Sequence, residues 1–124
     1  MDPWMEQELP LFQQIARRIE DGILSGAFPE GEQVPSTNEF SAQLKVNPAT
    51  VLKGMNLLAQ RRILEKRRGL GLFVAPGAQE RLWQERREDF LETTVKKVLE
   101  EADRLGISRG EIARLIERGE RDEY

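Results

Sequence analysis

The sequence predicts a mainly helical protein with one small β-hairpin, followed by two further helices at its C-terminal end. Three observations predict this fold class. Apolar residues recur at helical spacing in three segments before residue 60, two short β-prone runs flank a turn soon afterwards, and a charged stretch with a 3.5-residue apolar repeat follows. A chain of 124 residues suffices for one ordinary domain, or for one small domain with an appendage. We expect two parts, residues 1–76 and residues 77–124.

The first two helices are predicted on either side of a loop. The first, over residues 11–24, follows from apolar residues at spacings of three and four, namely Phe12, Ile15, Ile19 and Ile23. The segment FPEGEQVPS is typical of a loop, and we expect a short strand around residues 33–34. Ser36 and Glu39 form an S-x-x-E capping box, which predicts the second helix over residues 37–45.

The third helix is predicted to begin at Pro48, in the stretch LKVNPATVLKGMNLL. Proline suits the first helical position because it needs no N–H partner there, and Asn47 before it is a favoured N-cap. The N-terminus of this helix should also offer free N–H groups and the positive end of the helix dipole, which suit a phosphate. Its inward stripe consists of Val51, Gly54, Met55 and Leu58, and its outward face of Ala49, Thr50, Lys53 and Asn56.

The segment RILEKRRGLGLFVAP predicts a hairpin with a positively charged tip. Two β-prone runs, residues 63–66 and 72–74, flank a basic turn that contains glycine. Between Lys45 and Gly69 the chain carries seven basic residues and one acidic residue, a net charge of +6, although the whole chain has a net charge of −3. This asymmetry indicates an anionic partner for one face of the molecule.

The last part is predicted to form two helices that pack helix against helix. Gly106 ends the longer one, and a capping box of Ser108 and Glu111 starts the shorter one. An isolated pair of helices cannot bury both faces, so we expect a homodimer, with packing inside the chain as the alternative. The expected interface consists of Phe90, Leu91, Val95, Val98, Leu99 and Ala102.

Composition excludes several classes of function. Cysteine and histidine are absent, which removes thiolate chemistry, the usual zinc ligands and the side chain that titrates near neutral pH. The paired acids, Glu100 with Glu101 and Asp122 with Glu123, lie on charged helical surfaces typical of solvation. No apolar run approaches the roughly 20 residues that span a bilayer. We therefore expect a cytoplasmic protein with no membrane partner, no metal and no cofactor, which is not an enzyme.

The predicted order of elements is that of a winged helix-turn-helix. Three helices, of which the last two are tightly joined, are followed by a hairpin with a basic tip. In that fold the third helix enters the major groove of DNA and the hairpin, or wing, reaches along the backbone. Lys53 on the third helix, and Arg67 and Arg68 at the wing, can each neutralise a phosphate. Thr50 can bond a base edge, and the methyl group of Ala49 or Thr50 can contact thymine.

The chain resembles the GntR family of bacterial transcription regulators over a little more than half of its length. The resemblance rests on G-x-x-x-P-S, V-N-P-x-T-V and R-R-G-x-G-x-F-V, which occur in this order. The short helical tail resembles the YtrA subfamily, whose compact C-terminal elements mediate dimerisation. This resemblance implies a dimeric repressor, often of its own operon and of transporter genes, that binds a pseudo-palindromic operator.

Carried over to this sequence, the family's DNA contacts fall on three segments. They are Ser36, Thr37 and Asn38 at the second helix, Asn47, Pro48, Ala49, Thr50 and Lys53 at the third, and Arg67, Arg68, Gly69, Leu70 and Gly71 in the wing. The sequence departs from the family at Asn38, where arginine is common, and at Leu52 and Leu70, where a basic residue is frequent. These departures imply a modified operator preference or a lower affinity.

Other interpretations stay open at this point. Asn47 can contact DNA, cap the helix, or do both, and each basic residue can be merely solvated. A winged-helix protein-interaction module is the second function class, and it predicts that the basic segment is dispensable. The short tail has little volume for an enclosed ligand pocket. An unidentified small-molecule effector, where one exists, is expected in the groove between the two parts or at the dimer interface.

Overall fold

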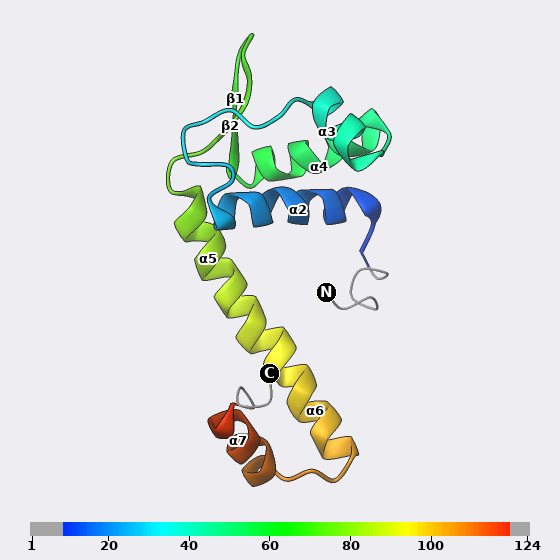
Figure 1. Ribbon diagram of the computed structural model, residues 1–124, viewed down its shortest axis with the longest axis vertical. Helices are drawn as coiled ribbons and strands as arrows, with labels where there is room; N and C mark the ends of the chain where they lie inside the picture. The colour runs from blue at the N-terminus through cyan, green and yellow to red at the C-terminus, as the bar shows by residue number, and fades with distance from the viewer. Residues whose placement is uncertain (1–8, 120–124) are drawn as a thin grey trace. The chain divides into compact units, whose positions relative to one another are not determined.

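The computed structural model describes residues 9–119, which form two compact units divided between Trp83 and Gln84 (Figure 1). The outer ends of both predicted parts, residues 1–8 and 120–124, lie outside the described residues. The first unit contains α2 (Leu11–Ser25), α3 (Thr37–Leu44), α4 (Pro48–Gln60), β1 (Leu64–Arg67), β2 (Gly71–Val74) and the start of α5 (Ala78–Asp89). The second contains the rest of α5, the π-helical segment η1 (Phe90–Val95), α6 (Lys96–Arg104) and α7 (Arg109–Arg118).

The predicted fold class is confirmed, because the described chain is mostly helical with one antiparallel two-stranded hairpin. The register pairs Leu64 with Val74 and Arg67 with Gly71. Relative to the prediction, β1 is shifted by one residue toward the turn, and β2 begins one residue earlier but ends at the predicted residue. The expected strand around residues 33–34 is a single bridge between Gln33 and Phe73. Its prolines and glycine keep this segment from forming a longer strand.

Local sequence signals explain where the helices begin and end. Ser36 and Glu39 form the expected capping box at α3, and Ser108 begins α7 in the same way. Lys45 ends α3 with a left-handed backbone conformation, φ 56°. The predicted regular helix after residue 77 is interrupted by η1, where three successive β-branched residues crowd a regular α-helical turn.

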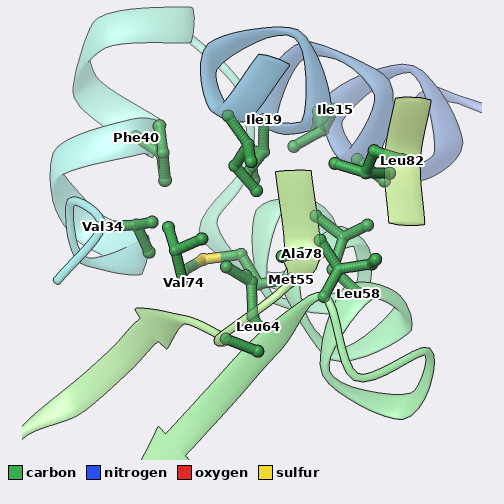
Figure 2. Packing of buried hydrophobic residues seen from close by; sticks show 14 of the residues in the cluster. Ile15, Ile19, Val34, Phe40, Met55, Leu58, Leu64, Val74, Ala78 and Leu82 are labelled. Atoms are coloured by element: carbon green, nitrogen blue, oxygen red, sulfur yellow. The ribbon is translucent and has the colours of Figure 1, made fainter. Parts of the chain in front are cut away.

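The core of the first unit lies between α2, α4, the hairpin and the start of α5. Figure 2 shows side chains from these elements, together with Phe40 of α3, converging on one cluster. Ala78 and Leu82 of α5 are almost fully buried in it. The predicted boundary after residue 76 is therefore too early, because the first turns of α5 complete this core.

The close approach of α2 and α4 depends on Gly54. A Cβ atom at this position would lie 2.7 Å from the backbone carbonyl oxygen of Phe12, which no side chain rearrangement can relieve. The absence of a side chain at Gly54 thus permits the two helix backbones to lie in contact. At the other end of α4, the guanidinium of Arg61 donates to the carboxylate of Glu20, which is only 5% exposed on α2. These two contacts fix α4 against α2.

We expect Gly54→Ala to lower the free energy of unfolding of the first unit by about 1–3 kcal/mol, because the added methyl group overpacks a backbone contact. Chemical denaturation followed by circular dichroism measures this loss. Gly110→Ala on α7 is the matched control, since its Cβ would meet the far end of the flexible Arg114 side chain at 3.3 Å and the Ser108 hydroxyl at an ordinary contact distance of 3.8 Å. An unchanged stability of Gly54→Ala would show that the two helices can separate without cost.

Candidate nucleic-acid interface

The N-terminus of α4 is held by its capping residue. The side-chain oxygen of Asn47 accepts from the backbone N–H of Ala49 at 2.8 Å, and the backbone oxygen of Asn47 accepts from Thr50 at 3.0 Å. Pro48 occupies the first helical turn and has no N–H. Asn47 therefore caps the helix. The expectation of free N–H groups at this terminus is wrong, and only the positive end of the dipole and the side chains are available to a phosphate.

The outward face of α4 carries a mixture of polar and apolar side chains. Ala49, Lys53 and Asn56 are exposed as predicted, whereas Thr50 is half-buried. Leu52, which the amphipathic pattern did not place on this face, is 46% exposed. These residues border a shallow, open depression of about 400 Å³ whose lining consists of Phe12, Ala49, Leu52, Lys53, Asn56, Leu57 and Gln60.

The start of α3 contributes less than the sequence predicts. The hydroxyl of Ser36 accepts from the N–H of Glu39 at 3.1 Å, so it is engaged in the cap. The hydroxyl of Thr37 donates to the sulfur of Met55 at 3.6 Å and is thereby turned toward α4. Asn38 is exposed and has no hydrogen-bond partner among residues 9–119. Of the three predicted contacts here, Asn38 alone combines an exposed side chain with a free polar group.

The wing presents its charge around a tight turn. Arg68 and Leu70 are exposed, and Leu70 is 63% accessible. Gly69 has a φ of 76° and Gly71 a φ of 117°, conformations that favour glycine. Arg67 is half-buried, because its guanidinium stacks on the ring of Phe73, 4.1 Å from the ring centroid.

Gln33 supports the wing and was missed by the sequence analysis. Its side-chain amide donates to the backbone carbonyl of Leu70 across 37 residues of chain. A Cβ on Gly71 would lie 2.6 Å from this amide nitrogen, so Gly71 leaves the space that the amide occupies. The only local signal was the strand expected around residues 33–34. It indicated that Gln33 lies near a strand, but not that its side chain contacts Leu70.

Comparison with known proteins decides the family. The profile described as "Bacterial regulatory proteins, gntR family" matches residues 11–74, more than half of the chain. The chain belongs to the gntR family. It is therefore a DNA-binding transcriptional regulator of the helix-turn-helix type.

Two relatives from Bacillus subtilis (strain 168) illustrate this gntR relationship. The uncharacterized HTH-type transcriptional regulator YhcF is 31% identical over 114 residues, which are 90% of this chain and 91% of YhcF. The HTH-type transcriptional repressor YtrA is 30% identical over 70 residues, 56% of this chain and 54% of YtrA. The match to YhcF thus extends into the helical tail, whereas the match to YtrA is limited to about half of each protein.

Solved structures of gntR relatives share the fold. A GntR-family transcriptional regulator from Bacteroides thetaiotaomicron superposes with a TM-score of 0.76 at 31% identity, over 93% of this chain and all of that one. The DNA-binding domain of AraR in complex with operator ORX1 superposes with a TM-score of 0.53 at 29% identity, over 60% of this chain and 90% of that one. The second of these contains DNA.

The second unit of this gntR protein exposes half of the apolar residues predicted for dimerisation. Phe90, Leu91 and Val98 are exposed, and Val95 and Leu99 are half-buried. Ala102 is only 3% exposed, because the chain turns back after α6 and covers it within the same unit. Further exposed apolar side chains that were not predicted are Leu105, Leu115 and Ile116.

Neither a metal centre nor a membrane span was found in the part of this gntR protein that the structure describes. Between residues 9 and 119, no three histidine, cysteine or acidic side chains are close enough together to hold a metal ion. None of the helices in that range is both long enough and apolar enough to span a bilayer.

The pKa of Glu39 is lowered from its ordinary value of 4.5, chiefly because its carboxylate accepts the backbone N–H of Ser36 and also because it bonds the Ser36 hydroxyl. A lowered pKa means that the ionised form stabilises the folded state above the unfolded pKa, and that this stability is lost as the pH falls through the folded pKa. Glutamine can accept the same bond without a charge.

We therefore expect wild type to have a higher thermal unfolding midpoint than Glu39→Gln near neutral pH, with the difference shrinking as the pH falls below 4.5. Thermal unfolding by circular dichroism across this range measures both midpoints. A difference that stays constant with pH would show that the carboxylate charge contributes nothing to the cap.

Proposed function

We propose that this regulator is a homodimeric repressor that binds a pseudo-palindromic operator through α4 and the wing of each protomer. The strongest support is the distribution of positive charge, because the segment from Lys45 to Gly69 has a net charge of +6. In this segment α4 presents the exposed Ala49 and Lys53, and the hairpin presents Arg67 and Arg68. Positive charge concentrated on a helix-turn-helix and its wing is the arrangement that neutralises phosphates along one side of a duplex.

The proposed contacts divide by role. Three basic residues bind phosphate: Lys53 on α4, and Arg67 and Arg68 in the wing. Thr50 and Asn38 bond base edges, and Ala49 contacts a thymine methyl group. Leu70 meets the sugar edges of the groove, and Gly69 and Gly71 shape the turn that carries it. Four of the predicted contact residues act on DNA only indirectly, because their side chains hold the starts of α3 and α4 in place. They are Ser36, Thr37, Asn47 and Pro48.

Membership of a YtrA-like subfamily is part of this proposal. The helices that follow the wing support it, as does the 30% identity to the repressor YtrA. The proposal places the protein in the cytoplasm, where a regulator has access to the chromosome. It assigns the protein no catalytic activity. An unidentified small-molecule effector, if the protein responds to one, would bind at the dimer interface.

A winged-helix protein-interaction module is the competing function. It would leave Lys53, Arg67 and Arg68 without a role, and it would not require binding to DNA. The operator complex of the AraR domain, which has the same fold, favours DNA. The competing function is therefore treated as one outcome of the binding experiment.

Selection of bound duplexes from a random pool, followed by fluorescence anisotropy, tests the function. We expect binding that weakens steeply with salt, because counterions are released from the neutralised phosphates. Lys53→Ala should weaken binding to selected and scrambled duplexes equally and reduce the salt slope by about 0.9, the value for one phosphate. Thr50→Ala should instead reduce, at one base pair, the discrimination of about 1–3 kcal/mol that a matched contact provides.

Arg87→Ala is the matched control, because Arg87 is an exposed arginine of α5 outside the first unit. It should leave affinity and salt slope unchanged. Absence of duplex binding at low salt, or binding insensitive to salt, would overturn the proposal in favour of the interaction module.

We expect Leu91→Asp and Val98→Asp each to convert a dimer into a monomer and to weaken operator binding, because a carboxylate would be buried in an apolar interface. Both residues are exposed in the single chain, Leu91 to 64% and Val98 to 46%. Sedimentation velocity measures the state of assembly. Lys96→Asp, at an exposed position of α6, adds the same carboxylate without removing an apolar side chain and should remain dimeric. A dimer that survives both apolar substitutions would place the interface elsewhere.

A further inference from the structure

The ammonium group of Lys53 lies over the ring of Phe12, 4.2 Å from the ring centroid. Lys53 is exposed on α4, whereas Phe12 is half-buried on the neighbouring α2. Figure 1 shows these two helices side by side, and a Cβ on Gly54, the residue after Lys53, would lie 2.7 Å from the carbonyl oxygen of Phe12. The ring is therefore held by the packing of α2 on α4, while the charge that it contacts faces solvent.

A second basic side chain is held in the same way in the wing. The guanidinium carbon of Arg67 lies 4.1 Å from the centroid of the Phe73 ring. Phe73 is on the opposite strand, where it pairs with Glu65, and the Glu65 carboxylate is also 3.6 Å from Arg67. The side chain of Arg67 nevertheless remains 41% exposed.

An aromatic ring holds a cation differently from a carboxylate. The negative face of the ring attracts the charge and limits its rotamers, so less side-chain freedom is lost when the cation meets a phosphate. The ring carries no net charge, and it covers only one side of the cation. The N–H donors of Lys53 therefore stay available to phosphate oxygens, whereas those of Arg67 are shared with the carboxylate of Glu65.

We infer that Phe12 and Phe73 are positioning residues for DNA binding, which limit the rotamers of Lys53 and Arg67 and so place their charges for the phosphate backbone. This inference rests on the proposed function and adds to it two residues outside the predicted contact set. Phe12 belongs by its spacing to the apolar stripe of α2, so packing is its other role. The experiment must therefore separate its effect on Lys53 from its effect on stability.

A double-mutant cycle makes this separation. Phe12→Leu keeps an apolar side chain and removes the ring, and it should weaken operator binding about two- to fivefold, the equivalent of an exposed cation–π contact. In the Lys53→Ala background the same substitution should have no effect, because the cation is gone. Phe12→Tyr retains the ring and should bind the operator as tightly as wild type.

A spectroscopic measurement tests the geometry without DNA. The ring current of Phe12 should shift the ε-methylene protons of Lys53 upfield in the NMR spectrum of the free protein, and Phe12→Leu should abolish this shift. Phe28→Leu is the matched control, because Phe28 contacts the ring of Phe40 and neither cation. It should leave both the shift and the operator affinity unchanged.

Phe73→Leu, combined with Arg67→Ala, should show the same coupling in the wing. Equal losses of affinity from Phe12→Leu with and without Lys53, or an unshifted Lys53 resonance in wild type, would overturn the inference while the proposed function stands. A wild-type protein that binds no duplex DNA would overturn the proposed function and this inference with it.

Discussion

The close contact between α2 and α4 at Gly54 determines the geometry of the first unit. Because no side chain separates the two backbones at this point, α4 lies directly against the carbonyl oxygen of Phe12. The inward stripe of α4 then fills the core, and its opposite face is turned outward with Lys53 next to the ring of Phe12. The buried carboxylate of Glu20 fixes the far end of the same helix through Arg61. One steric requirement thus sets both the packing and the exposed surface of the helix.

At the helix caps and in the wing, polar side chains form hydrogen bonds that fix the backbone. These side chains are then not available to bind a partner. The oxygen of Asn47 is used by the first turn of α4, and the hydroxyl of Ser36 by the first turn of α3. Gln33 fixes the wing turn through the carbonyl of Leu70. Residues that a family motif groups as contacts therefore differ in kind. Some present a side chain to a partner, and others hold the chain so that a neighbour can do so.

Much of the fold followed from local signals in the sequence. The capping residue Ser36 and the pair formed by Asn47 and Pro48 placed helix starts within a residue, because a cap involves only neighbours in the chain. The contacts of Gln33 with Leu70 and of Phe12 with Lys53 could not be predicted, since each joins segments that are distant in sequence. Helical spacing predicted only that Phe12 lies on the inward face of α2. It did not predict that the face of its ring would meet a cation.

The distribution of charge restricts how the proposed operator complex can form. The chain as a whole is negative, −3, yet the segment from Lys45 to Gly69 is +6, so the remainder of the molecule is repelled by a duplex. Long-range attraction then acts on α4 and the wing alone and orients the protein before any base is contacted. Within that segment the single acidic residue, Glu65, already faces Arg67, whereas Lys53 and Arg68 have no acidic partner among the contacts described. Lys53, in the middle of α4, and Arg68, at the turn of the wing, therefore keep their positive charge available to the duplex.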